Sequence, residues 1–176
     1  MRRKCGACTL CCRLLPVREL DKGANERCQY QRNTGCRVYR APSKGFPISC
    51  GLWSCQWLTR PTTEALKRPD RSHYVIDAQP DMIRVNNKDT GESQELACLQ
   101  VWVDPGFPEA WHDPALLAFI DASGQPALIR RNQVDGFAIF PPSVTGQEKF
   151  IISGPSESVP TITGSRILDQ LVAETA

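Results

Sequence analysis

A chain of 176 residues is long enough for one ordinary domain, or for a small module joined to a modest body, and too short for a large two-domain enzyme. Its longest apolar runs fall well below the roughly 18 residues that a membrane-spanning helix needs, so we expect no segment to cross a bilayer. The basic start MRRK is followed by cysteines, an arginine and a proline instead of the apolar core of a secretory signal, which predicts a cytoplasmic protein.

Charge and cysteine divide the chain at the same point. The net charge is only +2, but residues 1–60 hold 12 Lys and Arg against three acidic residues, a net +9. The remaining 116 residues hold nine basic and 16 acidic groups, a net −7. Eight of the nine cysteines also lie in residues 1–60. The coinciding boundaries predict a Cys-rich N-terminal module at 1–60 and a body of different character after it.

Residues 1–60 show neither the apolar stripe of a helix nor the alternation of a strand, so this module cannot bury much apolar surface. A segment of this kind needs disulfides or metal to offset its ordering entropy. Residues 61–72 are expected to form a linker or short helix, because Thr62 or Thr63 can cap a helical turn that Pro69 ends.

Residues 73–176 have the pattern of an ordinary globular body. Asp113 followed by Pro114 predicts a helix start, and Gly124 its end. Helical spacing of apolar residues behind Ser165 predicts a second helix over 165–174. Short apolar runs bounded by turn residues, including a turn at 89–91, predict strands at 73–76, 82–85, 95–103, 127–130, 136–140 and 149–153. The chain is therefore predicted to be α+β, with a small metal-stabilised Cys-rich module packed on an antiparallel sheet with one or two helices.

The cysteines of the module are the candidate metal ligands: Cys5, Cys8, Cys11, Cys12, Cys28, Cys36, Cys50 and Cys55. Disulfides suit exported chains, and no export signal is visible, so metal is the better explanation. C-x-x-C spacing lets two sulfurs converge on one ion in zinc sites and in iron-sulfur sites alike. The run CxxCxxC is shared with bacterial ferredoxins, which slightly favours an iron-sulfur cluster over zinc.

Eight thiolates can complete two four-thiolate sites, each carrying about two negative charges, so two sites would lower the +9 of the module to about +5. Four arginines beside cysteines are expected to favour the thiolate form, namely Arg13, Arg27, Arg37 and Arg40. Cys11 and Cys12 are adjacent, and we expect their side chains to point apart and to serve different metals or different irons. The basic face could instead contact nucleic acid or an acidic partner.

The order of these residues resembles a known family. CGACTLCC at the start, GCRVY around Cys36 and the late Cys50, Cys55 and Trp57 are similar to the YkgJ-type CxxCxxCC cysteine-cluster family, described as a zinc- or iron-chelating domain. RPDRSHYVI at 68–76 extends the likeness. The resemblance implies that the eight cysteines bind zinc or iron, and it carries over no enzymatic activity.

Other candidate residues have ordinary structural explanations. His73 and His112 are expected to be structural, and Cys98 in a strand to be a buried small hydrophobe. Trp102, Phe107 and Trp111 could line a pocket, although core packing is the commoner use of such residues.

Function is predicted at the level of metal binding. No carboxylate pair or Ser-His-Asp grouping is visible, which leaves open whether the protein is an enzyme. The leading hypothesis is a cytoplasmic metal-binding protein with a structural or redox centre and a possible protein partner. The alternatives are a cluster-dependent enzyme or electron carrier, and a basic module that binds nucleic acid or an acidic partner.

Overall fold

The computed structural model describes residues 3–86 and 93–153. The N-terminal part is built from short elements: α1 (Leu10–Leu14), η1 (Arg18–Leu20), β1 (Gln31–Arg32), β2 (Gly35–Cys36), η2 (Pro42–Lys44), α2 (Ile48–Leu52), α3 (Gln56–Thr59), η3 (Pro61–Thr63) and α4 (Pro69–Ser72). The body contains β3 (Tyr74–Ile76), β4 (Asp81–Asn86), β5 (Ser93–Val103), η4 (Ala110–His112), α5 (Pro114–Ser123), β6 (Ala127–Arg130), β7 (Gly136–Phe140), α6 (Pro142–Thr145) and β8 (Ile151–Ser153).

The six body strands form one sheet in the order β3-β5-β6-β7-β8, with β4 also paired to β5. All six lie where the sequence predicts strands, whereas the expected turn at 89–91 and helix at 165–174 lie outside the described residues. The sequence predicted a purely antiparallel sheet, and this prediction is wrong for one pair of strands, because β5 and β6 run parallel. The chain leaves β5, passes through α5 and returns to the sheet in the same direction, as a helical crossover does.

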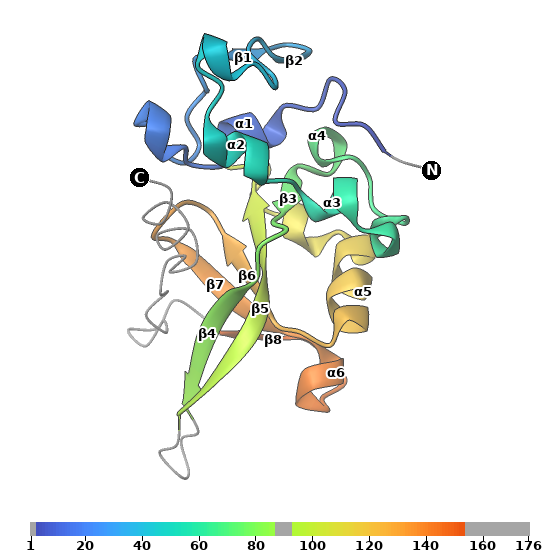
Figure 1. Ribbon diagram of the computed structural model, residues 1–176. Coiled ribbons are helices and arrows are strands. Elements are labelled where there is room, and N and C mark those ends of the chain that lie inside the picture. The colour runs from blue at the N-terminus through green and yellow to red at the C-terminus, as the bar shows by residue number, and fades with distance from the viewer. Residues whose placement is uncertain (1–2, 87–92, 154–176) are drawn as a thin grey trace.

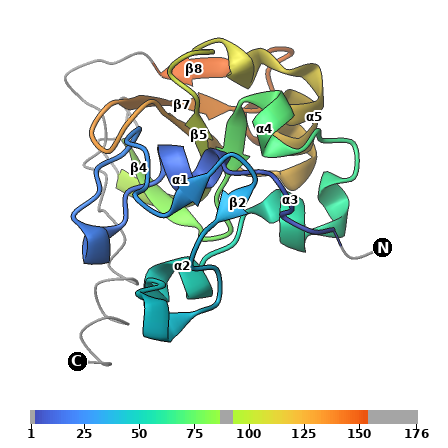
Figure 2. The same ribbon diagram turned by 90° about the horizontal axis from the view of Figure 1, so that it is seen from above.

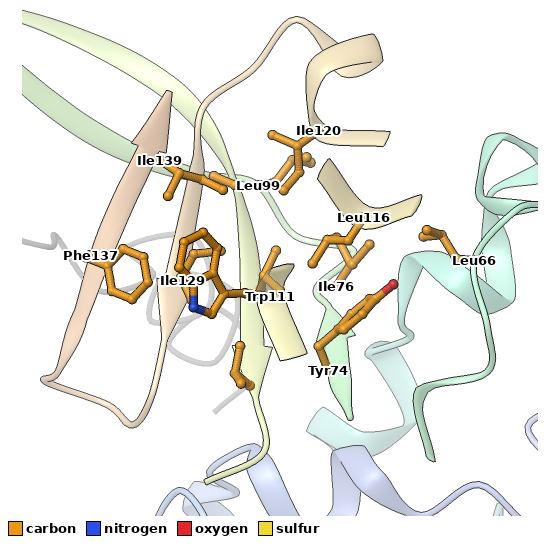
Figure 3. Close-up of a cluster of buried hydrophobic side chains, with 13 residues drawn as sticks. Leu66, Tyr74, Ile76, Leu99, Trp111, Leu116, Ile120, Ile129, Phe137 and Ile139 are labelled. Carbon is orange, nitrogen blue, oxygen red and sulfur yellow. The ribbon is translucent and has the colours of Figure 1, made fainter. Parts of the chain in front are cut away.

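The core lies between one face of the sheet and α5 (Figure 3). Alternation along β5 directs Leu99, Val101 and Val103 to this face, where they meet Leu116 and Ile120 of the helix. The helix begins as predicted, since the Asp113 carboxylate accepts a hydrogen bond from the Ala115 amide at 3.0 Å. It ends at Gly124, which has a φ of +63°. No helix in the described part of the chain is long and apolar enough to cross a membrane.

The opposite face of the sheet carries the cysteine-rich part, which lies at the β3 end (Figures 1 and 2). Val75 of β3 and Trp102 of β5 pack against Leu10, Leu14 and Cys8. The N-terminal part therefore contributes its few apolar side chains to a shared core with the sheet, instead of building a core of its own.

Candidate metal centre

The eight cysteines of residues 5–55 are all free thiols held by short elements. Cys5 and Cys8 lie in a turn in which the Cys8 amide donates to the Cys5 carbonyl at 3.0 Å. Cys11 and Cys12 belong to α1. Cys28 lies shortly before β1, Cys36 ends β2, Cys50 lies in α2 and Cys55 directly precedes α3. Cys98 is separate, since it lies in β5 and its side chain is 1% exposed, as the sequence predicts for a small hydrophobe.

Four of these thiols form a group against the sheet, which we call the inner set: Cys5, Cys8, Cys11 and Cys55. They belong to the hydrophobic cluster that contains Val75 and Trp102. Burial, with repulsion from Cys8 and Cys55, raises the pKa of the Cys5 thiol to about 11. Burial, opposed by backbone hydrogen bonds, likewise raises the pKa of Cys55, and Cys8 adds to this shift. The inner thiols are thus mutually close and poorly hydrated.

The other four thiols form an outer set: Cys12, Cys28, Cys36 and Cys50. Burial raises the pKa of Cys36, and repulsion from Cys12 and Cys28 adds to the shift. Burial and the same two neighbours raise the pKa of Cys50 to about 11. Cys12 lies in α1, Cys28 precedes the β1–β2 hairpin, Cys36 ends that hairpin and Cys50 lies in α2.

The two sets meet at α1, where Cys11 of the inner set is followed directly by Cys12 of the outer set. The Cys11 thiol donates a hydrogen bond to the Cys12 sulfur, which raises the pKa of Cys11 and, together with Lys22, lowers the pKa of Cys12 to about 7. The sequence led us to expect that these side chains point apart, whereas this interaction brings the two sulfurs near each other. Neighbouring side chains on a helix diverge by about 100°, not 180°, and α1 is a single short turn, so the two S–H groups can approach each other.

Each set has one nearby cation, and neither was anticipated from the sequence. Lys22 is only 7% exposed, and its ammonium donates to the carbonyls of Arg13, Leu15 and Gly23 while lying near Cys12, Cys28 and Cys50. Arg68 lies near Cys5 and Cys8 and holds Asp70 through two hydrogen bonds of 2.5 and 2.7 Å. Lys22 gives no sequence signal, because its burial follows from the turn that pairs Val17 with Lys22 and directs its ammonium to backbone carbonyls, which any residue type supplies.

The arginines that the sequence singled out have other roles. Arg13 forms an ion pair with the buried Asp104 of the body, which ties α1 to the end of β5. Arg37 and Arg40 lie over the rings of Tyr30 and Tyr39, at 5.6 and 5.4 Å from the ring centroids. Arg27 is exposed and has no carboxylate partner within residues 3–86 and 93–153. The cations that lie near the thiols are therefore Lys22 and Arg68, and not the four arginines expected from the sequence.

Asp77 fixes the last cysteine to the sheet. Its backbone forms an isolated antiparallel bridge with Cys55, and its carboxylate accepts a hydrogen bond of 2.7 Å from the Trp53 indole. The Gln56 side chain donates to the Asp77 carbonyl at 2.8 Å. Desolvation raises the pKa of the Asp77 carboxyl. This connection between Cys55 and the sheet has no local signal in the sequence, since a single Asp after a short strand resembles any turn residue.

The remaining sequence candidates lie outside the thiol sets. His73 stacks on Phe107, with ring centroids 3.5 Å apart, and His112 contacts Glu109 at 3.0 Å. Trp102 and Trp111 pack on opposite faces of the sheet, in different clusters, so together with the exposed Phe107 they line no common pocket. Core packing, the commoner use of such residues, is confirmed for both tryptophans.

The donor set suits a soft metal centre. Four thiolates are the ligand complement of structural zinc and of iron-sulfur clusters, and each set supplies four sulfurs. Within the described ranges, no three His, Cys, Asp or Glu side chains are yet arranged around a common ion position. Ligation therefore requires the sulfurs of a set to draw together and to lose their protons, which couples binding to ordering of the module.

Comparison of the chain with models of protein families, with curated proteins and with solved structures finds no match in any of the three. The functional assignment accordingly depends on the cysteine motif and on the two groups of thiols described above.

Proposed function

We propose that the protein is a cytoplasmic metal-binding protein of the YkgJ-type CxxCxxCC cysteine-cluster kind, whose eight clustered cysteines hold iron-sulfur or zinc. The observation that carries the proposal is the division of eight free thiols into two groups of four, each beside one cation. A bound metal would supply the positive charge that the buried inner thiols lack, and would thereby stabilise their thiolate forms.

The chain's own residues prepare both sets. Lys22 holds the segment after α1 by three carbonyl contacts and places its charge beside the outer set. Asp77 and Trp53 hold Cys55 against β3, and the apolar cluster around Trp102 excludes water from the inner set. The primary role that these features support is structural, because the module has little apolar surface of its own to stabilise it.

The test is anaerobic purification of the full chain with analysis of zinc, iron and acid-labile sulfide. We expect either about two zinc ions per chain or iron with sulfide, as two four-thiolate sites require. Cys8→Ser, in the inner set, and Cys36→Ser, in the outer set, should each lower the metal content. Cys98→Ser should leave the metal content unchanged, because Cys98 lies in β5, apart from both sets. Protein that binds no metal, with every thiol of the two sets reactive, would refute the proposal.

A redox role is the second candidate, and the CxxCxxC run is what favours it. Iron-sulfur protein should show visible absorption that dithionite bleaches. Colourless protein with stoichiometric zinc would leave only the structural role.

A further inference from the structure

The helix α2 lies at the outer end of the cysteine-rich part (Figure 2). Large apolar side chains on this helix and in the segment before it are exposed. We define the α2 surface as Tyr39, Phe46, Ile48 and Leu52 with their flanking cations Arg40 and Lys44. Ile48 is 72% exposed and Leu52 69%, and their spacing of four residues places both on one side of α2. Two large aliphatic side chains at these exposures on one helical turn are unusual for a surface in contact only with water.

Phe46 connects the loop before α2 to the helix itself. Its ring meets the ring of Tyr39 edge-on, with centroids 5.8 Å apart. On its other side, a Cβ atom at Gly51 would lie 3.5 Å from Phe46 Cε1, so the ring packs on the α2 backbone. Tyr39, itself 56% exposed, is therefore held next to the helix, and the apolar side chains form one continuous surface.

The charge around this surface has one sign. Residues 27–63 contain six Lys and Arg and not one Asp or Glu. Arg40 lies over the Tyr39 ring, and neither Arg40 nor Lys44 forms an ion pair with a carboxylate in the described part of the chain. Glu19, which reaches α2 from η1, is occupied by two hydrogen bonds of 2.8 Å to Ser49.

The thiols do not account for these cations either. The groups that shift the pKa of Cys36 are burial, a backbone hydrogen bond and two other cysteines, and no Arg or Lys is among them. Cys50 likewise interacts with cysteines, Ser49 and Glu19, and its nearby cation is Lys22 of the outer set, not Arg40 or Lys44. Within residues 3–86 and 93–153, the basic side chains of the α2 surface thus have neither a carboxylate nor a thiol as partner.

We propose that the α2 surface docks an acidic amphipathic helix of a partner protein. Leucine-like side chains of the partner cover Ile48, Leu52 and Tyr39, and its flanking carboxylates reach Arg40 and Lys44. A nucleic acid fits less well, since bases stack on aromatic rings and phosphates pair with cations, but neither covers two exposed aliphatic side chains. The inference is independent of which metal the thiols bind.

The test measures binding of the full chain, purified anaerobically, to fluorescein-labelled probes by anisotropy. The first probe is a synthetic helix with leucines along one face and glutamates on both flanks. The second has the same composition in scrambled order, and the third is a 20-nucleotide oligothymidine. We expect the amphipathic helix to bind at least about tenfold more tightly than the other two, because only it matches both apolar side chains and charge.

Surface variants locate the contact. The double changes Ile48→Ser with Leu52→Ser, and Arg40→Glu with Lys44→Glu, should each weaken helix binding at least about tenfold. The matched controls are Val134→Ser, at a side chain that is 86% exposed on the β6–β7 turn, and Lys67→Glu, at an exposed cation in the segment between η3 and α4; both should bind as the parent chain does. All variants concern exposed side chains, so thermal unfolding should stay unchanged.

Three results would overturn the proposal. The first is absence of helix binding up to millimolar concentration in low salt. The second is an affinity that the α2 variants and the controls change equally. The third is tighter binding of oligothymidine, with a steep salt dependence, which would make this surface a nucleic-acid site.

Discussion

At the scale of single residues, the hydrogen bond between Cys11 and Cys12 makes one thiol of the site unusually acidic. The pKa of Cys12 is lowered to about 7 by this bond and by Lys22, from an ordinary value of 9.0. A thiol with a lowered pKa carries more thiolate at neutral pH, and the thiolate is the reactive form. In metal-free protein Cys12 should therefore be alkylated first by iodoacetamide, because its lowered pKa gives it more thiolate at pH 7 than the other thiols of the two sets have.

The measurement is the time course of labelling at pH 7, followed by peptide mass spectrometry. Cys12→Ala should remove the fast phase, whereas Cys50→Ala should keep it because burial raises the pKa of Cys50 to about 11. Cys98, which is 1% exposed with a pKa of about 12, should react last. A fast phase that persists without Cys12 would contradict this assignment.

Lys22 should contribute to stability through the carbonyls that its buried ammonium binds. Its buried ammonium satisfies three carbonyls, and Lys22→Met would leave them without a donor. We expect the free energy of unfolding of metal-loaded protein to fall by about 2 kcal/mol, the scale of buried polar groups left unpaired. Urea denaturation measures this change. Lys67→Met, at an exposed lysine, is the control and should change the free energy little. If the two substitutions changed the free energy of unfolding equally, the three carbonyl contacts of Lys22 would not stabilise the fold.

At the scale of elements, the two thiol sets are supported unequally. The inner set is packed on β3 and β5 with Trp102 and Val75, whereas the outer set is carried by a hairpin of two-residue strands and the five-residue α2. Short elements with few buried contacts open more readily than a sheet. Metal at the outer set should therefore leave first.

Transfer of zinc from loaded protein to excess EDTA should accordingly show two phases. Cys36→Ser should abolish the fast phase and Cys8→Ser the slow one, while Cys98→Ser preserves both. Release in a single phase, with both variants affecting it alike, would mean that the eight sulfurs behave as one site.

The same scale shows what the sequence could predict. Alternation in β5 and the Asp113–Pro114 start of α5 are local signals, and both elements form where expected. The parallel pairing of β5 with β6 has no local signal, because it depends on which edge of β5 the chain meets after the helix. The cysteines were visible from spacing, but their division into sets was not. Cys55 is 43 residues from Cys12 and joins the inner set only because the Asp77 bridge holds it at β3.

At the scale of the whole molecule, the cysteine-rich part and the sheet share one core through Val75 and Trp102 and one ion pair through Arg13 and Asp104. The other face of the sheet has a larger core with α5 that involves no cysteine of either set. We therefore expect the sheet and α5 to stay folded when metal is removed.

Hydrogen exchange after chelation tests this expectation. Amides of residues 3–60 should exchange faster, while those of β5, β6 and β7 keep their protection, because only the former depend on metal ligation for order. Cys98→Ser with and without chelator is the control for effects of the reagent on a buried thiol. Uniform loss of protection would show instead that the chain unfolds as one unit.

The position of Trp102 also gives the protein an internal optical probe. Its indole is buried in the same cluster as the inner set, and its ring centroid lies 5.2 Å from the guanidinium carbon of Arg130. Trp53, hydrogen-bonded to Asp77, lies in the same cluster. Iron close to an indole quenches its fluorescence and zinc does not, so the ultraviolet emission of these two side chains would identify the metal of the inner set without any label.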